Sequence, residues 1–318
     1  MYYIGVDLGG TNIAAGIVDG ETGKIIKKGS VPTNAKRQPD EIIKDMAELC
    51  KNLLKEQGLT TDDVEYAGIA TPGTADHDHG IVKYTNNLPF VNYPIADKLK
   101  EFLGIEKVLI ENDANAAAKG EAAYGAAKGY KDSITITLGT GLGGGIIIDG
   151  KVYSGYNYAG AELGHTVIVV DGLPCTCGRK GCWEAYSSAT GLIKMTKKHL
   201  EGTSKNDTIM WDFIEAEGKV SGRTAFDAMR KGDKLGKQVV DEYIKYLAVG
   251  VINMINIFQP EVFLIGGGIC NEKENLTKPL VEYINKYQYN KDKNCGTLVK
   301  TALLGNDAGI IGAAMLGI

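Results

Sequence analysis

Two segments of this chain, 130 residues apart, follow the same pattern of residues. The first reads YYIGVDLGGTNIAAGIVDG from Tyr2, and the second reads ITITLGTGLGGGIIIDG from Ile134. Seventeen consecutive positions superpose without a gap, and each copy contains an apolar run, a glycine turn, a second apolar run and Asp-Gly. Asp-Gly after a strand predicts a two-residue hairpin turn, here at Asp19-Gly20 and at Asp149-Gly150. Matched apolar runs arise easily by chance, but matched turns do not, so the repeat predicts two domains of like topology that each open with a β-hairpin.

The second copy contains the stretch TLGTGLGGG, from Thr137 to Gly145, in which five of the nine residues are glycine. Glycine at this density is kept where the backbone turns sharply or approaches a ligand closely, although a loose surface loop has a similar composition. The match to the dinucleotide pattern G-x-G-x-x-G leads into a strand rather than a helix, so it does not indicate a Rossmann site. Together with DLGGT in the first copy, the stretch predicts two turns that hold the phosphates of a nucleoside triphosphate. Gly143 to Gly145 align with Ile13 to Ala15, which favours close backbone packing for these last three glycines.

Apolar periodicity predicts that strands and helices alternate along the rest of the chain. Strands are predicted at residues 64–70, 107–110 and 262–268, and helices at 40–57, within 91–103, in the alanine-rich stretch 111–125, at 235–258 and at the end of the chain. Alternation of this kind, with glycines at the strand ends, indicates an α/β architecture in which ligands bind beyond those ends.

Composition excludes some classes of partner. The 318 residues are 44% hydrophobic and 23% charged, which is typical of a globular protein large enough for two domains. The formal net charge of -4 gives no electrostatic reason to expect a nucleic acid or a membrane surface as partner. No apolar run approaches the roughly 20 residues of a membrane span, and a strand begins at Tyr2 without a secretory signal before it. We therefore expect a cytoplasmic protein that binds neither nucleic acid nor membrane.

Three of the six cysteines lie close together and follow a histidine, in the order His165, Cys175, Cys177 and Cys182. In an intracellular chain such a cluster indicates a metal site rather than disulfides. Three thiolates and one imidazole complete a tetrahedral shell that favours zinc over magnesium or calcium. Since four protein ligands leave no open position, the zinc is predicted to be structural. The alternative is a set of reduced bystander thiols.

Other histidines and cysteines are weaker candidates for metal ligands. His77 and His79 form an His-x-His pair in a polar loop, but no further ligand stands nearby in sequence. Cys50, Cys270 and Cys295 are scattered, and we interpret them as buried or incidental thiols.

Two aspartates stand where predicted strands end. Asp7 precedes the first glycine turn, where a carboxylate beside phosphates can bind hydrated Mg²⁺. Asp113 ends the strand KVLIEND and begins the alanine-rich helix. It can serve as a helix N-cap, or as a general base that accepts a hydroxyl proton during phosphoryl transfer.

These motifs occur together in a fixed order. DLGGT at 7–11 is followed by END at 111–113, the glycine run, ELGH at 162–165 and C-x-C-G-x-x-G-C-x-E at 175–184. In this combination the chain resembles the ROK family (repressors, open reading frames, sugar kinases), from residue 4 to about residue 312. The cysteine motif joined to Glu-x-Gly-His is the specific part of the resemblance, whereas glycine turns alone are common.

The resemblance implies the actin-like ATPase fold, a duplicated ribonuclease H-like α/β architecture with the active cleft between two domains. A small N-terminal domain would span residues 1–116, with a C-terminal helix of about 305–318 packed back on it. A larger domain with the zinc loop and the nucleotide site would span 117–304. Family members lead us to expect a homodimer or homotetramer.

The resemblance also implies an ATP-dependent kinase for the 6-hydroxyl of a hexose, with glucose as the expected substrate. Asp113 matches the catalytic base. The residues that match hexose contacts are Gly73, Asn87, Asn112, Asp113, Glu162, His165 (also a zinc ligand) and Glu184. Those that match the ATP site, with Mg²⁺ as its companion, are Asp7, Gly9, Gly10, Thr11, Asn12, Thr137, Gly139, Thr140, Gly141, Gly266, Gly267 and Gly268. Asn12 is a departure, because many family members have lysine there.

Several alternatives stay open at this point. Fructose, mannose, N-acetylmannosamine or allose could replace glucose, and polyphosphate could replace ATP, because spacing does not resolve specificity. A sugar-responsive repressor is a different class within the family. Such repressors carry a DNA-binding segment ahead of the first glycine turn, and here six residues precede Asp7, which argues against that class.

Overall fold

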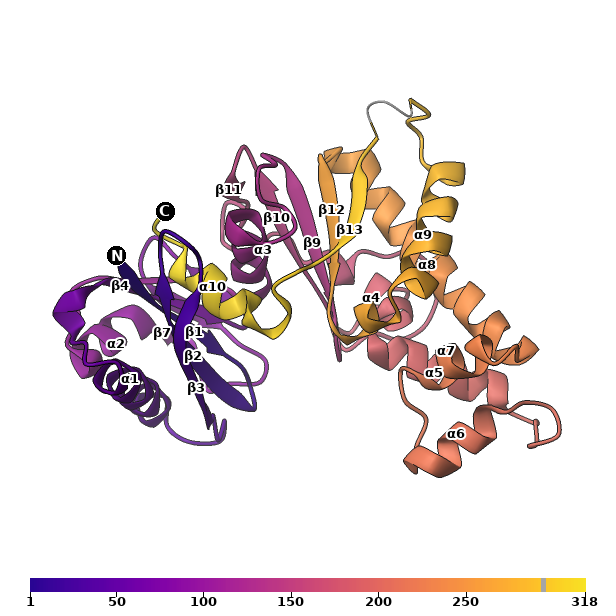
Figure 1. The fold of residues 1–318 in the computed structure, drawn as a ribbon, viewed down its shortest axis with the longest axis horizontal. Coiled ribbons are helices and arrows are strands. Elements are labelled where there is room, and N and C mark those ends of the chain that lie inside the picture. Colours follow the sequence, from indigo (N-terminus) through magenta and orange to yellow (C-terminus); the bar gives the residue numbers. More distant parts are fainter. Residues whose placement is uncertain (293–295) are drawn as a thin grey trace. The chain divides into compact units, whose positions relative to one another are not determined.

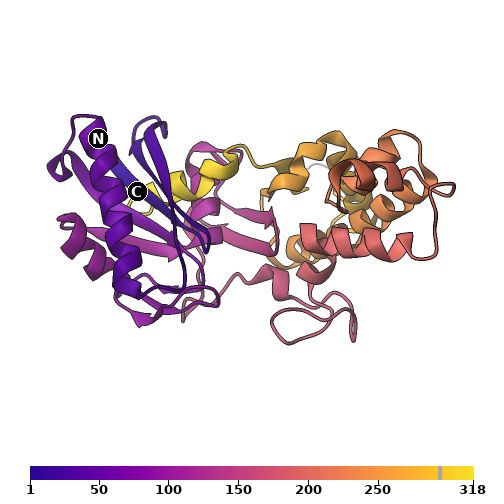
Figure 2. The ribbon, with the colours of Figure 1, turned by 90° about the horizontal axis from the view of Figure 1, so that it is seen from below.

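The structure is a computed structural model that describes residues 1–292 and 296–318. The described residues form two compact units. Unit 1 comprises Met1–Thr135, Gly145–Ala161 and Ala302–Ile318, and unit 2 comprises Ile136–Gly144 and Glu162–Thr301. Figures 1 and 2 show the path of the chain through both units. Cys295 lies outside the described residues.

Unit 1 is built on a five-stranded sheet with the order β3-β2-β1-β4-β8. Its strands are β1 (Tyr2–Leu8), β2 (Asn12–Asp19), β3 (Ile25–Pro32), β4 (Val64–Thr71) and β8 (Val108–Asn112). The first three strands are antiparallel neighbours, whereas β4 and β8 run parallel to β1. The carboxyl ends of β1, β4 and β8 therefore meet at one edge of the sheet, where ligands bind in α/β folds.

Helices cover both faces of this sheet. On one face lie α1 (Pro39–Glu56) and α2 (Ile95–Leu103), and on the other lie α3 (Asp113–Tyr124) and the short α10 (Ala308–Ala314). Side chains of β1 alternate between the two cores: Ile4, Val6 and Leu8 pack with α1, while Tyr3 packs with α10. A small sheet of β5 (Thr74–Asp76), β6 (Ile81–Tyr84) and β7 (Val91–Tyr93) lies in the chain between β4 and α2.

Glycines let α10 pack with its backbone directly against its neighbours. A Cβ atom at Gly5 of β1 would lie 1.9 Å from the carbonyl oxygen of Ile310, and one at Gly312 would lie 1.7 Å from that of Ala116 in α3. Neither site can accept a side chain without a shift of the backbone. The C-terminal segment is therefore an integral part of unit 1.

The second sheet repeats the topology of the first. Its order is β11-β10-β9-β12-β13, with β9 (Ser133–Leu138), β10 (Leu142–Ile148), β11 (Lys151–Val152), β12 (Val262–Gly266) and β13 (Leu298–Thr301). In both sheets the opening strand is central, its hairpin partners follow on one side, and the later strands lie on the other. The duplication predicted from the 130-residue repeat is thus confirmed.

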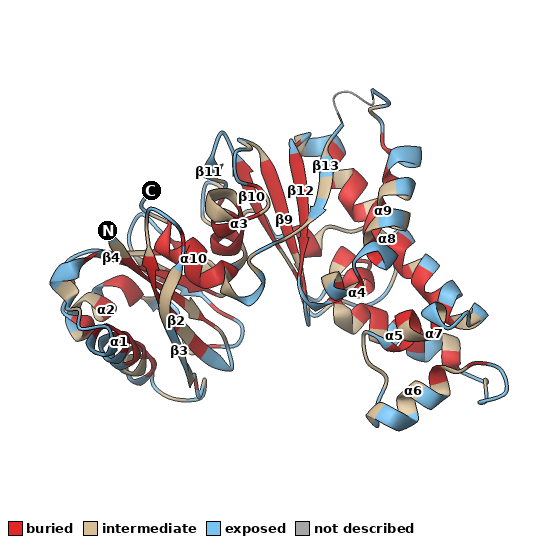
Figure 3. Cartoon of the chain, viewed as in Figure 1, coloured by how far each residue is buried: buried red, intermediate tan, exposed pale blue. Residues whose placement is uncertain are grey.

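Unit 2 is mostly helical after residue 182. Its helices are α4 (Trp183–Ser187), α5 (Ala189–Leu200), α6 (Met210–Glu217), α7 (Thr224–Arg230), α8 (Lys234–Phe258) and α9 (Glu274–Tyr287). Asp233 caps α8 by accepting a hydrogen bond from the N–H of Gly236 over 2.7 Å. Most residues between Tyr243 and Ile255 of this helix are buried, whereas its first part has an exposed face (Figure 3). The ring of Trp183 lies against Gly250, where a Cβ atom would come within 2.0 Å of it. The predicted buried helix is therefore confirmed for this second part and wrong for the first.

The prediction of a two-residue turn at Asp-Gly is confirmed in the second copy and wrong in the first. Asp149 (φ 50°) and Gly150 (φ 76°) form the expected two-residue turn between β10 and β11. In the first copy β2 ends at Asp19 and β3 begins only at Ile25. The carboxylate of Asp19 accepts a hydrogen bond from the N–H of Glu21 over 2.8 Å, which supports the wider turn.

Close packing explains two of the last three glycines of the glycine-rich stretch, as predicted. A Cβ atom at Gly144 would lie 2.6 Å from the side chain of Leu163, and one at Gly145 would lie 2.6 Å from the carbonyl oxygen of Ala114. Cys50 is buried and Cys270 is half-buried. Among the described residues, no helix combines the length and the apolar character that a membrane crossing requires.

Candidate active site and metal centre

The first glycine turn joins β1 to β2 and leaves its outer residues exposed. The N–H of Gly9 donates to the carbonyl oxygen of Asn12 over 2.9 Å. The hydroxyl of Thr33 donates to the carbonyl oxygen of Gly9 over 2.6 Å, and the N–H of Thr33 donates to that of Thr11. Gly10, Thr11 and Asn12 are exposed. The turn is thus held from one side and open on the other.

Two predicted ligand residues of unit 1 lie beside this turn. Asp7, the next-to-last residue of β1, is half-buried, and a Cβ atom at Gly309 of α10 would lie 2.6 Å from its carboxylate. Burial raises the pKa of the Asp7 carboxyl above its ordinary value. Asn87 is exposed, and its Cβ lies 3.7 Å from where a Cβ atom of Gly10 would stand. The predicted phosphate turn and one predicted sugar contact are therefore neighbours in space.

The junction of β8 and α3 carries the candidate base. The side chain of Asn112 caps α3 by accepting hydrogen bonds from the N–H groups of Ala114 (3.0 Å) and Asn115 (3.2 Å). The alternative role of Asp113 as N-cap is thus wrong, because the preceding residue does that work. Asp113 is the first residue of the helix and is exposed, and its carboxylate accepts a hydrogen bond from the N–H of Ala114 over 2.8 Å.

The side-chain amide of Asn112 also ties two strand ends together. Its nitrogen donates to the carbonyl oxygen of Gly73 over 3.1 Å, just after β4. Gly73 has φ 83°, and a Cβ atom there would lie 2.0 Å from the carbonyl oxygen of Tyr84, so only glycine fits. Because both lone pairs of the Asn112 oxygen serve the cap, its second amide hydrogen is what remains for a ligand.

In unit 2, the second glycine turn joins β9 to β10. The N–H of Gly139 donates to the carbonyl oxygen of Gly141 over 3.0 Å, and the turn is held from behind by the N–H of Ala189 and the hydroxyl of Thr190. Gly139 and Thr140 are exposed, and Thr137 is half-buried. A Cβ atom at Gly139 would meet no other atom within 4 Å. Space for a ligand therefore lies over this part of the turn.

The three glycines at the end of β12 lie next to the same turn. Gly267 has φ 94°, and a Cβ atom there would lie 2.2 Å from the carbonyl oxygen of Leu138. Gly268 begins a 3-10 turn that ends at Glu272, and a Cβ atom there would meet open space. Gly266 is buried, while Gly267 and Gly268 are exposed. The ends of β9 and β12 thus bring together those glycines of unit 2 that were predicted to contact ATP.

The predicted metal ligands form one cluster. The ligand atoms of His165, Cys175, Cys177 and Cys182 all lie within 4.8 Å of one another. Sγ of Cys177 lies 3.6 Å from that of Cys182, and Sγ of Cys175 lies 3.5 Å from Nδ1 of His165. Tetrahedral zinc with ordinary bond lengths requires roughly 3.8 Å between two sulfurs and roughly 3.6 Å between sulfur and nitrogen. The cluster could therefore hold a metal ion, and its dimensions fit zinc.

Burial raises the pKa of the Cys182 thiol to about 12, so this residue would be a thiolate ligand only with a cation beside it. His77 and His79 are arranged differently, since each ring pairs with a carboxylate: His77 with Glu111 (3.2 Å) and His79 with Asp76 (2.9 Å). Within residues 1–292 and 296–318, neither belongs to a group of potential metal ligands.

Two predicted sugar contacts flank the metal cluster. Glu162 is exposed and precedes the 3-10 turn Leu163–His165, in which the N–H of His165 donates to the carbonyl oxygen of Glu162. Glu184 lies in α4, two residues after Cys182, the last cysteine of the cluster. One carboxylate oxygen of Glu184 lies 3.8 Å from Sγ of Cys175, and the other accepts a hydrogen bond from the N–H of Leu142 over 2.9 Å. The sequence patterns contain no signal for this second contact.

Sequence reasoning also missed Glu111. This carboxylate is 4% exposed and lies immediately before Asn112 and Asp113. The available signal was a carboxylate in the motif END, at the end of a predicted strand. If such a carboxylate is buried, it must find hydrogen-bond partners.

Known proteins resemble this chain over its whole length. The sequence model of the ROK family matches residues 3–318. The glucokinase of Thermotoga maritima is 37% identical over 315 residues, which cover 98% of this chain and 96% of that protein. An N-acetyl-D-glucosamine kinase of Vibrio atlanticus is 30% identical over 328 residues, which cover 100% of both chains.

A solved structure extends the likeness to three dimensions. The ROK family glucokinase from Streptomyces griseus, in complex with glucose and AMPPNP, superposes with a TM-score of 0.82. It is 35% identical, and the match covers 99% of each chain. This likeness confirms the predicted α/β fold of the actin-like ATPases.

Proposed function

The chain belongs to the ROK family, and from that premise we propose that it transfers the γ-phosphoryl group of ATP to the 6-hydroxyl of glucose. The near-complete match to the glucokinases of Thermotoga maritima and Streptomyces griseus supports glucose as substrate, and AMPPNP in the second of them supports ATP as donor. Family membership alone does not separate a kinase from a regulator, whereas the side chains of the site do.

The observation that carries the proposal is the position of Asp113. Its carboxylate is exposed at the carboxyl end of β8, and Asn112 rather than Asp113 caps the helix that follows. Asp113 is thereby held on a rigid junction next to Gly73 and Asn112, which match hexose contacts. A carboxylate in that place can accept a proton from a bound hydroxyl.

The proposed reaction is one displacement at phosphorus. The 6-oxygen of glucose forms a bond to the γ-phosphorus as the bond from that phosphorus to the leaving oxygen of ADP breaks. The hydroxyl proton passes to the carboxylate of Asp113. The products are glucose 6-phosphate and ADP, and the proton then leaves Asp113 to solvent.

Backbone groups of each glycine turn are proposed to bind phosphate oxygens. The exposed part of each turn presents N–H groups and a threonine hydroxyl, from Thr11 in the first and Thr140 in the second. Gly268 and its neighbours would lie against the adenosine. Mg²⁺, for which Asp7 offers a carboxylate, would neutralise phosphate charge when bound.

We assign zinc to the cluster of His165 and three cysteines, with a structural role. Since Nδ1 of His165 faces the sulfurs, Nε2 of the same ring remains for a sugar hydroxyl. Glu162 and Glu184 flank the cluster, so the metal would fix the positions of three proposed sugar contacts.

The test is Asp113→Asn, assayed with glucose and Mg-ATP. Loss of a general base is expected to lower kcat by about 10²- to 10⁴-fold, while the KM for glucose stays within several-fold. Asp97→Asn is the matched control, because Asp97 also lies in the first turn of a helix and is exposed. Near-normal turnover of the Asp113 variant would refute the assignment.

Phosphorylation of N-acetylglucosamine is the second candidate, because a kinase for that sugar is similar over the full length of this chain. A panel of hexoses and N-acetylhexosamines, each with ATP or polyphosphate, decides between them through kcat/KM. We further propose a cytoplasmic homodimer or homotetramer, as in the family resemblance. Light scattering after size exclusion measures the assembly.

A further inference from the structure

Glu111 is a buried carboxylate that the proposed mechanism does not use. It lies in β8, two residues before Asp113, and is 4% exposed. A buried charge is costly unless it is paired and hydrogen-bonded, so the surroundings of Glu111 must supply partners.

Four donors surround this carboxylate. Oε1 accepts hydrogen bonds from the N–H of Asn112 (2.8 Å) and the side-chain amide of Asn115 (3.1 Å). Oε2 accepts one from the hydroxyl of Ser154 (3.0 Å) and lies 3.2 Å from Nδ1 of His77. A carboxylate has about four acceptor positions, and all of them are used here.

The four donors come from three segments that are far apart in sequence. Asn112 and Asn115 belong to the start of α3, Ser154 follows β11, and His77 lies between β5 and β6. Each donor except His77 is fixed by burial or by the helix cap. Glu111 therefore joins the junction that carries Asp113 to two loops of unit 1.

The loop after β11 contacts this group twice. Besides Ser154, it contributes Tyr158, whose ring meets the ring of His77 edge-on with centroids 4.8 Å apart. The hydroxyl of Tyr158 donates to Asp78 over 2.6 Å. The segment then ends at Ala161, directly before Glu162 in the chain. His77 is thus held between the buried carboxylate and this loop.

We infer that Glu111, with His77 and Ser154 as its partners, is a positioning residue that fixes the first turn of α3 and so the orientation of Asp113. The inference rests on the proposed function, since it takes Asp113 as the base. Displacement of a reacting group by about 1 Å can slow an enzyme about 10²-fold, so an anchor behind the base affects turnover.

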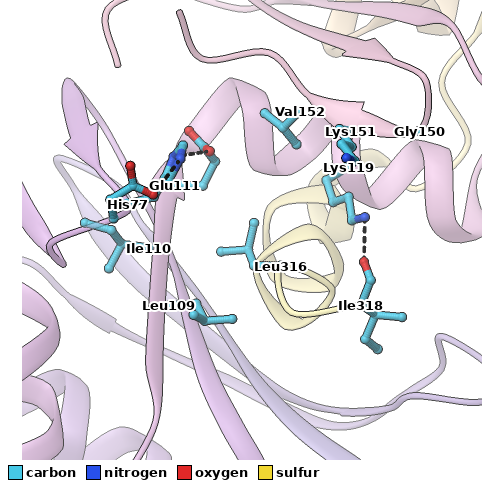
Figure 4. Close-up of a pocket in the computed structure, with 11 residues that line it drawn as sticks. His77, Leu109, Ile110, Glu111, Lys119, Gly150, Lys151, Val152, Leu316 and Ile318 are labelled. Carbon is cyan, nitrogen blue, oxygen red and sulfur yellow. Dashed lines mark hydrogen bonds and ion pairs between the residues drawn. The ribbon is translucent and has the colours of Figure 1, made fainter. Parts of the chain in front are cut away.

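The charge state of His77 links this anchor to pH. The hydrogen bond to Glu111 is the main cause that raises the pKa of His77, while its partial burial acts in the opposite direction. Three other titratable groups lie close to His77: Asp76 and Asp78 of its own loop, and Tyr158. Lys119 and Lys151 line the same pocket as His77, which has a volume of about 460 Å³ (Figure 4). The charge on His77 strengthens this pairing and is lost as pH rises through the raised pKa of His77.

The experiment compares four variants of the full chain: Glu111→Gln, His77→Gln, their combination, and Ser154→Ala. In Glu111→Gln an NH₂ group replaces one carboxylate oxygen and must then face the two donors of that oxygen. The anchor is weakened, so kcat is expected to fall about 10- to 100-fold while the KM for ATP stays within about twofold. His77→Gln is expected to lower kcat several-fold and to remove a decline of kcat on the alkaline side of the wild-type profile. The double variant should be no slower than Glu111→Gln alone, because the two residues act together.

His79→Gln is the matched control, since His79 lies in the same loop but pairs with Asp76, which Lys83 also contacts at 2.9 Å. Its kcat should equal that of the wild type. If His77→Gln and Ser154→Ala retain full kcat at every pH, or if His77→Gln and His79→Gln are slowed equally, the inference is overturned. His77→Gln and Ser154→Ala test the inference even if Glu111→Gln does not fold. Activity of Asp113→Asn would instead refute the proposed function, so the two failures are distinguishable.

Discussion

The carboxylate of Glu184 accepts a hydrogen bond from the backbone N–H of Leu142, over 2.9 Å, immediately after the second glycine turn. A residue proposed to hold a sugar hydroxyl is therefore also bonded to the turn proposed to hold phosphate. The same carboxylate reaches toward Cys175 of the metal cluster. The side chain of Glu184 thus connects the proposed sugar site, the second glycine turn and the metal cluster. Its position depends on the absence of a side chain at Gly141.

Gly141→Ala should disrupt this connection. The new Cβ atom would lie 2.5 Å from the Glu184 carboxylate, and one of the two groups must move. Loss of a hydrogen bond to a charged acceptor is expected to lower the free energy of unfolding by about 1.5–3 kcal/mol. We also expect a raised KM for glucose, measured by steady-state kinetics beside thermal unfolding.

Gly139→Ala tests the phosphate turn without disturbing the fold. Since a Cβ atom at Gly139 meets no other atom within 4 Å, the unfolding temperature should stay unchanged. The added methyl group would occupy space that the proposed phosphates need, so the KM for ATP should rise about 10-fold or more, as for a loss of about 1.4 kcal/mol. A normal KM for ATP would show that phosphate does not approach this part of the turn.

The metal cluster predicts one zinc ion per chain. Cys182→Ser should abolish the bound zinc, lower the unfolding temperature and reduce turnover. Cys182 shares the cluster with His165 and with Cys175, whose Sγ lies 3.8 Å from Glu184, so loss of the metal would loosen both proposed sugar contacts. Cys270→Ser is the matched control, since this half-buried thiol lies outside the cluster. Elemental analysis of both purified variants measures the metal. Full activity in a wild-type sample stripped of metal would contradict a supporting role for zinc.

The sequence predicted features that are set locally or by repetition. Apolar periodicity and the glycine turns identify both hairpins, and a motif of eighteen residues contains every ligand of the metal cluster, from His165 to Cys182. Asn112 and Asp113 are both good N-cap residues, so the sequence alone could not decide which one caps α3. The partners of Glu111 were hidden for another reason. His77 and Ser154 lie 34 and 43 residues away, and tertiary packing alone brings them together.

Asp7→Asn should stabilise the protein while it impairs the reaction. Burial raises the pKa of Asp7, so folding favours the protonated carboxyl and the charged form is held at a cost at neutral pH. The variant should therefore have a larger free energy of unfolding than the wild type at pH 7.5. That gain should shrink as pH falls through the raised pKa, because the wild-type carboxyl is then neutral as well.

The same variant should lose activity. Removal of the carboxylate that is proposed to bind Mg²⁺ beside ATP is expected to lower kcat/KM by about 10²-fold, in line with several kcal/mol of charge stabilisation. Denaturant titrations at a series of pH values, from pH 7.5 down to the ordinary pKa of an aspartate at about 3.9, measure the stability. Asp62→Asn, at an exposed aspartate, is the control. Equal destabilisation of the Asp7 variant at every pH would contradict the prediction.

His77→Gln should destabilise the protein more at low pH than at high pH. Its folded-state pKa is raised above the ordinary value, chiefly by the hydrogen bond to Glu111. The stabilisation is therefore fully present below about pH 6.5 and is lost as pH rises through the raised pKa. Since the side chain is 38% exposed, solvent screening limits the effect to the order of 1 kcal/mol or less. Urea unfolding at pH 6 and pH 9 measures the difference, which His79→Gln should not reproduce because Asp76 keeps Lys83 as a partner. A loss of stability that is the same at both pH values would mean that His77 acts through packing on Tyr158 rather than through its charge.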